Sequence, residues 1–175
     1  MIENFRLITA KENLIRPNIT PNVGDSLFEF ASDEEYKEYI NNAPQGLRWE
    51  FLGKEIKFFE KPISLFGLPT PNLQRVVVVY PYDHQTYTSP NNAVIYNNDG
   101  SFYIQLKCPQ LISDLAKKSR LIPFGLYFER VAWSKDSKGD IITSISIGYN
   151  RDWWESRVLN PETGEFGELL SSGLR

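Results

Sequence analysis

The sequence predicts an α+β protein, with a mostly antiparallel, twisted sheet of about six or seven strands and two short helices packed on one face. Short runs rich in Val, Ile, Phe and Tyr show the alternation typical of strands, Pro and Gly separate them, and only two segments carry an apolar pattern at helical period. The chain has 175 residues, of which 41% are hydrophobic and 14% aromatic. That is enough for one domain with its own core.

We expect a single domain over residues 1–175, because no linker, repeat or low-complexity tract divides the chain. Residues 1–26 are expected to form an irregular N-terminal segment. Residues 160–175 contain the turn sequence PETG and are expected to form a loosely ordered tail.

The first predicted element is a helix from about Asp33 to Asn42. The preceding S-D-E-E sequence, Ser32 to Glu35, is a capping box in which each residue satisfies a backbone N–H of the other. Apolar residues then follow at helical spacing and form one stripe: Tyr36, Tyr39, Ile40 and Ala43. Pro44 ends the pattern.

Strands are expected in the middle of the chain. Trp49 and Phe51, then Ile56 and Phe58, alternate with polar residues around the turn residue Gly53, which predicts a hairpin. The run from Val76 to Tyr80 is apolar on both faces, as is typical of a strand in the middle of a sheet.

A second hairpin is predicted around Asn98-Asp99-Gly100, a strong turn sequence. Its second strand places Cys108 on an apolar face. Pro109 then suits a first helical turn, and the apolar spacing of residues 110–120 predicts the second helix. A third hairpin is expected from segments 125–133 and 140–149, joined by a polar loop.

Composition excludes several classes of protein. The single cysteine, Cys108, cannot form an intramolecular disulfide, and no metal-ligand spacing accompanies it, so we expect no zinc site and a reducing, cytoplasmic location. No signal peptide or membrane-spanning run is present, and no phosphate-binding glycine motif predicts a cofactor. A pI near 5.3 without a basic run argues against nucleic-acid binding.

The loop YPYDHQTYTSP, from Tyr80 to Pro90, contains the only histidine. His84 could act as a base with Cys108 as nucleophile, or be oriented by Asp83. Neither pair belongs to a recognisable motif, and a cysteine on an apolar strand face usually has a raised pKa. We therefore assign no catalytic residue and expect no enzymatic activity.

Binding explains more of the unusual residues. Tyr82, Asp83, His84 and Tyr87 combine rigid aromatic area with adaptable hydrogen bonding, as recognition loops do. Trp153 and Trp154 cannot both point inward from one strand, so at least one is expected to be exposed or half-exposed beside Arg157. Acidic residues dominate the first 60 positions, with 11 Asp and Glu against 7 Lys and Arg, and supply further candidates: Asp33, Glu34 and Glu38.

A small acidic domain of this type is similar, by composition alone, to bacterial toxin-neutralising immunity proteins and other accessory inhibitors. The expected function is therefore to bind a protein partner, basic and of the toxin or nuclease type, and to cover its active site. Two alternatives stay open. One is a small hydrolase or transferase that uses the His84 loop, and the other is a homo-oligomeric structural or accessory protein, so the oligomeric state is not predicted.

Overall fold

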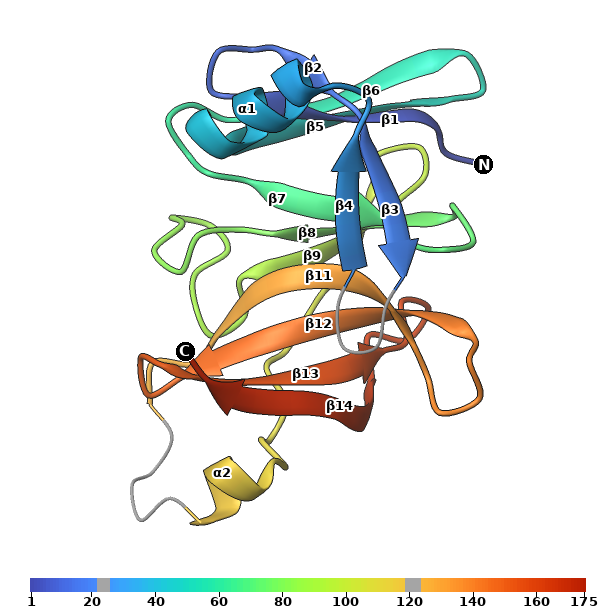
Figure 1. Cartoon of the computed structure of the whole chain (residues 1–175). Coiled ribbons are helices and arrows are strands. Elements are labelled where there is room, and N and C mark those ends of the chain that lie inside the picture. Colours follow the sequence, from blue (N-terminus) through green and yellow to red (C-terminus); the bar gives the residue numbers. More distant parts are fainter. Residues whose placement is uncertain (22–25, 119–123) are drawn as a thin grey trace.

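The computed structural model describes residues 1–21, 26–118 and 124–175 (Figure 1). About half of the chain is strand and less than a tenth is helix. The prediction of one six- or seven-stranded sheet with two packed helices is wrong, because the strands form three separate four-stranded antiparallel sheets and one two-stranded hairpin. The protein is largely β.

We name the three sheets by their height in Figure 1. The upper sheet has the order β2-β1-β5-β6, with β1 Glu3–Thr9, β2 Leu14–Ile15, β5 Pro44–Phe51 and β6 Lys54–Phe59. The middle sheet has the order β10-β9-β8-β7, with β7 Phe66–Pro69, β8 Arg75–Val79, β9 Ala93–Asn97 and β10 Phe102–Gln105.

The lower sheet has the order β11-β12-β13-β14, with β11 Tyr127–Lys135, β12 Ile141–Tyr149, β13 Trp153–Leu159 and β14 Phe166–Leu174. A separate hairpin, β3 Pro17–Pro21 with β4 Ser26–Phe30, stands in front of the tiers and contacts β11 (Figure 1). Residues 1–26, expected to be irregular, thus contain β1, β2 and β3, and residues 160–175, expected to be loosely ordered, contain β14.

The middle sheet is buried on both faces. Val76 and Val78 of β8 pack into a core shared with the upper sheet, where Trp49 and Leu47 are fully buried. Val77 and its neighbours on the opposite face pack into a second core shared with the lower sheet. The prediction that this valine run is a central strand is confirmed, since β8 lies between β7 and β9.

The middle and lower sheets are also joined by a buried side-chain amide. Asn92, just before β9, donates from Nδ2 to the carbonyl oxygens of Tyr80 (2.6 Å) and Phe128 (2.8 Å). Its Oδ1 accepts from the backbone N–H of Phe128 at 2.8 Å. The carboxamide therefore acts as a short strand partner for β11 and satisfies backbone groups that no water could reach.

Helix α1, Asp33–Asn41, is confirmed, and Ser32 Oγ accepts from the Glu35 backbone N–H at 3.2 Å. The Glu35 carboxylate reaches the N–H of Ala31 instead of that of Ser32. Neither α1 nor the short α2, Asp114–Lys118, contains a buried residue, so the expected packing of two helices on a sheet face is wrong. No helix in the described ranges is long and apolar enough to cross a membrane.

All three predicted hairpins form, the third as the antiparallel pair β11 and β12. β5 and β6 pair across the turn at Gly53, and β9 and β10 pair across Asn98-Asp99-Gly100. The second helix, predicted over residues 110–120, begins only at Asp114, because Ile112 and Ser113 donate their backbone N–H groups to the carboxylate of Glu155. These tertiary hydrogen bonds use backbone N–H groups in a segment where the sequence pattern suggested a helix, so the segment before α2 is not helical. Residues 119–120 of the prediction lie outside the described residues.

Replacing Asn92 by alanine would leave the buried N–H and C=O of Phe128 without partners. We expect the free energy of unfolding to fall by about 3 kcal/mol, since each unsatisfied buried group costs roughly 1–3 kcal/mol. Urea denaturation of Asn92→Ala against the exposed control Asn41→Ala measures this loss. A change of less than about 0.5 kcal/mol, the size usual for surface positions, would show that Asn92 does not join the sheets.

Candidate partner-binding surface

The His84 loop connects β8 to β9 and is organised around the imidazole. Nδ1 accepts from the backbone N–H groups of Thr86 (3.2 Å) and Tyr87 (3.0 Å). Nε2 lies 3.3 Å from a carboxylate oxygen of Glu60, to which it can donate. The ring is buried between the rings of Tyr80 and Tyr87. Both ring nitrogens are engaged in holding the loop, which leaves neither free to take a proton from a substrate.

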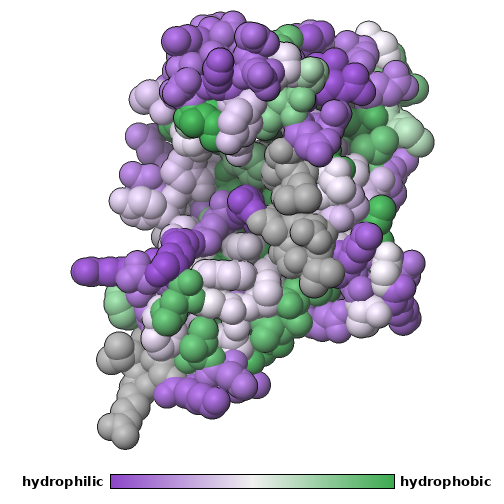
Figure 2. All heavy atoms as spheres, in the orientation of Figure 1, coloured by the Kyte–Doolittle hydropathy of each residue, from purple (hydrophilic) through white to green (hydrophobic). Residues whose placement is uncertain are grey.

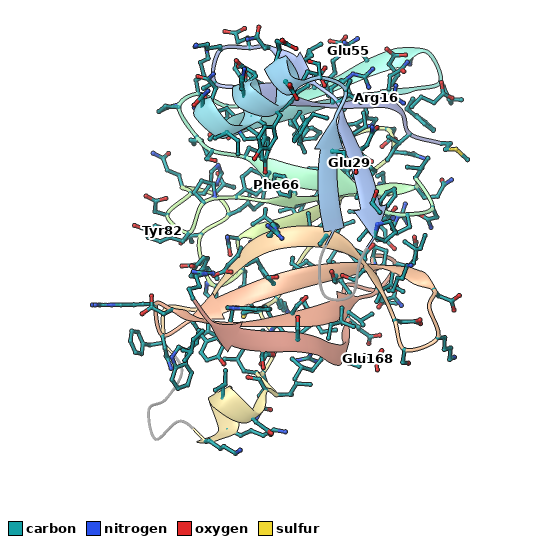
Figure 3. The ribbon with its side chains drawn as sticks, viewed as in Figure 1. Arg16, Glu29, Glu55, Phe66, Tyr82 and Glu168 are labelled. Carbon is teal, nitrogen blue, oxygen red and sulfur yellow. The ribbon has the colours of Figure 1, made fainter. Side chains whose placement is uncertain are left out.

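The rest of the loop divides into a buried part and an exposed part. The Tyr80 hydroxyl lies 2.7 Å from that of Tyr96, and burial raises the pKa of Tyr80 to about 12. Asp83 and Tyr82 are exposed, and Tyr82 projects from the left edge of the molecule (Figure 3). Among the predicted residues of this loop, these two are accessible to a partner, whereas His84 is part of the scaffold.

Cys108 is half-buried and packs against the core between the middle and lower sheets. Burial, with the nearby carboxylate of Glu155, raises the pKa of its thiol to about 11. Sγ has a weak contact with the carbonyl oxygen of Pro109, and no hydrogen bond or ion pair connects it to His84 in the described chain. The arrangement gives no activated thiolate.

Arg157 belongs to a buried ion pair. Its side chain is 7% exposed, and Nη1 lies 3.3 Å from the fully buried carboxylate of Glu155. Nε and Nη2 donate to the carbonyl oxygen of Gly167 at 2.9 and 2.7 Å. The guanidinium thus joins β13 to β14 and to the segment before α2, and it is not available to a partner. The sequence pattern could not show this, because a surface arginine and a paired buried one look alike.

The two tryptophans occupy opposite faces of β13. Trp153 packs edge-on against Tyr149 in the core, with ring centroids 5.9 Å apart. Trp154 lies over Gly173 on the outer face of the lower sheet, where a Cβ atom would meet its ring at 3.2 Å. Trp154 is half-buried there and lines a hollow of about 390 Å³ together with Arg130 and Ser146.

A second hollow, of about 310 Å³, adjoins the first and is lined by Tyr82, Phe66 and Tyr127. The two hollows share Glu129 and Arg175, which form an ion pair. The structure therefore brings the predicted residues Tyr82 and Trp154 to the two ends of one grooved face, near the C-terminus in Figure 1. This face is visibly hollowed at mid-height in Figure 2.

The predicted acidic residues lie on α1, at the top of the molecule, where Figure 2 shows hydrophilic atoms gathered. Asp33 and Glu34 are exposed. Glu38 is held by Thr9 and by Asn42, whose Nδ2 donates at 3.0 Å, and the hydrogen bond from Thr9 is the main cause of the lowered pKa of its carboxyl.

Two apolar side chains of α1 that the sequence predicted to be buried are exposed. Tyr36 is 54% and Ile40 is 61% exposed. Both belong to the stripe that was expected to face a core, and they are one helical turn apart on one face. A helix face that carries exposed apolar residues beside carboxylates has the composition of a contact surface. We call Asp33, Glu34, Tyr36 and Ile40 the α1 surface.

The exposed Glu168 lies far from the α1 surface. Glu168 is on β14 at the lower edge of the molecule, whereas α1 caps the top (Figures 1 and 3). Glu162 is paired with Arg75 at 2.8 Å. No group of three or more His, Cys, Asp or Glu residues is placed to hold a metal ion in the part of the chain that the structure describes.

If Arg157 is structural, its loss should reduce stability and not affinity. Removing one partner of a buried ion pair leaves the other charge uncompensated, so we expect Arg157→Gln to lower the free energy of unfolding by about 3 kcal/mol. Urea denaturation beside the exposed control Arg151→Gln tests this. Equal stability of the two variants would return Arg157 to the list of contact residues.

The raised pKa of Cys108 should make its thiol unreactive in the folded protein. With a pKa of about 11 in place of 9.0, thiolate at pH 8 is about 100-fold scarcer, since each unit is a factor of ten. Reaction with a chromogenic disulfide at pH 8 should be slower by about that factor in the native state than in denaturant. Equal rates would indicate an activated cysteine and revive the nucleophile alternative.

Comparison with known proteins supports the fold. Neither a scan of protein families nor a search of curated proteins found a match to this chain. Among solved structures, one chain from the complex of Tne2 with Tni2 is similar to this protein, with a TM-score of 0.65 at 12% sequence identity. The similarity covers 97% of both chains. This protein therefore shares its overall fold with that chain.

Proposed function

We propose that this protein is a cytoplasmic binding protein that neutralises a basic partner, of the toxin or nuclease type, by covering the partner's active site. The α1 surface is the proposed contact. One observation carries this proposal: α1 has no fully buried side chain and packs on the core only through the partly buried Tyr39. Tyr36 and Ile40 are instead exposed, beside the exposed carboxylates of Asp33 and Glu34.

The chemistry of the α1 surface suits a basic partner. Three acidic residues occupy the first turn of α1, and no basic residue occupies its last turn. Exposed carboxylates of one sign accelerate encounter with a basic surface, and this effect weakens as salt screens the charges. The apolar side chains of Tyr36 and Ile40 would then be buried against the partner, and this burial of apolar area slows dissociation.

The candidate catalytic groups favour binding over catalysis. Nδ1 of His84 accepts two hydrogen bonds inside its own loop and Nε2 faces the carboxylate of Glu60, and the pKa of Cys108 is raised. The shared fold with a chain from a two-protein complex agrees with a role in protein association. The single cysteine agrees with a reducing compartment.

The partner can be isolated with the wild-type protein as bait in extract of its native host, with washes of increasing salt. Asp33→Asn with Glu34→Gln should slow association roughly tenfold at low salt and flatten its salt dependence. Tyr36→Ala with Ile40→Ala should instead accelerate dissociation, by roughly tenfold. Surface plasmon resonance with the captured partner separates the two rate constants.

Glu168→Gln, on the opposite end of the molecule, is the matched control and should leave both rates unchanged. If it slows association and the α1 variants do not, the contact lies on the lower sheet. If neither set changes the rates, the electrostatic proposal fails. Recovery of this protein alone would favour the homo-oligomeric alternative, which light scattering at dilute concentration would then measure.

A further inference from the structure

A hollow of about 370 Å³ lies where four segments far apart in the sequence meet. β1 contributes Arg6, β3 and the residue before it contribute Arg16 and Asn18, the β7–β8 turn contributes Leu73, and β11 contributes Trp133. Figure 3 shows Arg16 at the upper end of the β3–β4 hairpin. None of these residues belongs to the α1 surface, the His84 loop or the groove between Tyr82 and Trp154.

The base of the hollow is apolar. Ile2, Pro17, Ile19 and Leu73 line it together with the half-buried ring of Trp133. The indole N–H of Trp133 donates to the carbonyl oxygen of Pro69 at 2.7 Å. A ligand in the hollow would therefore contact the apolar atoms of the ring and not its N–H group. Such a wall suits a flat hydrocarbon or aromatic group.

The polar side chains around this base are cationic or neutral, and Nδ2 of the neutral Asn4 already donates to Glu50 at 2.9 Å. Arg6 and Arg16 bring two guanidinium groups, and Asn4 and Asn18 bring two carboxamides, while no Asp or Glu is among the residues that line the hollow. Nη1 of Arg6 donates to its neighbour's carbonyl oxygen at 2.8 Å, which leaves the other N–H groups of its fork free for a ligand. Arg16 is exposed and makes no hydrogen bond or ion pair within the described ranges.

The backbone at the rim is held in unusual conformations. Leu73 has φ of +57° and Asn4 has φ of +50°, in the left-handed region that residues with side chains rarely adopt. The turn is fixed by hydrogen bonds from Leu73 N to Thr70 O (2.8 Å) and from Ile2 N to Leu73 O (2.9 Å). Strained but well-held residues of this kind gather at ligand sites, where they preform the binding geometry.

We propose that this hollow binds a small organic anion, one flat apolar group that carries a carboxylate, sulfonate or phosphate. The apolar group lies against Trp133 and Leu73, and the anionic group is bound by Arg6 and Arg16. Guanidinium is the side-chain group best suited to such oxyanions, and the volume is that of a small-ligand site. The site adds to the proposed partner binding and does not depend on it.

The probe for this site is 8-anilino-1-naphthalenesulfonate, which joins an aromatic body to one sulfonate. We expect saturable binding to the folded protein at one site, seen as probe fluorescence. In a ¹⁵N-labelled sample the indole N–H signal of Trp133, assigned with Trp133→Phe, should shift on titration. The indole signal of Trp49, whose N–H donates to Asn98 O in the upper sheet, should not shift.

Charge-matched controls define the result. Arg16→Gln, at an exposed position, and Arg6→Gln should each weaken binding roughly three- to tenfold, since a charge-assisted hydrogen bond is lost. Arg151→Gln, exposed and distant in sequence, should not. N-Phenyl-1-naphthylamine, which lacks the sulfonate, should bind more weakly than the probe. Equal binding by Arg16→Gln and Arg151→Gln, equal binding of the two dyes, or no shift at Trp133 would each overturn the proposal.

Discussion

The burial of the middle sheet on both faces is the constraint on which the rest of the structure depends. A sheet with two apolar faces is stable only if each face is covered, because exposed apolar area of that size is costly. The run of four valines in β8 meets this requirement by alternation: Val76 and Val78 face the upper sheet, and Val77 and Val79 face the lower one. Three tiers, and not one large sheet, follow from that need.

Much of the local structure could be predicted from residues close in sequence. The capping box at Ser32, the turns at Gly53 and Asn98-Asp99-Gly100, and the two-sided apolar character of β8 all depend on neighbours a few residues away. Each of these predictions is confirmed except for one half of the capping box, in which Glu35 accepts from Ala31 and not from Ser32. They succeed because the physical causes lie within the segment itself.

The grouping of strands into sheets could not be predicted in the same way. Alternation shows which side chains of a strand are buried but does not show what covers them. β1 pairs with β5 across more than thirty intervening residues, and the sequence of neither strand indicates which strand it pairs with. The same limit applies to the helices: the stripe containing Tyr36 has the spacing of a buried face, yet of its helical residues only Tyr39 packs against the core, and Tyr36 and Ile40 stay exposed.

Burial decides which candidate site residues are structural and which are accessible to a partner, and a single sequence does not reveal burial. Of the residues with obvious chemistry, His84, Glu155 and Arg157 are consumed by internal hydrogen bonds, and Asn92 joins two sheets. Buried polar groups of this kind must be fully satisfied, so they hold the loops and sheet ends in one arrangement. What is left at the surface is a set of carboxylates, exposed aromatic rings and arginines suited to contact.

Because α1 adds no buried side chain, its outer residues are nearly decoupled from the stability of the tiers beneath. Substitutions there are of the surface kind, which usually change the folding free energy by less than about 0.5 kcal/mol. Such a helix can diversify quickly under selection while the valine-filled middle sheet stays constant. Tolerance to substitution is therefore unevenly distributed over the molecule: it is lowest in the close-packed middle sheet and highest on the outer face of α1.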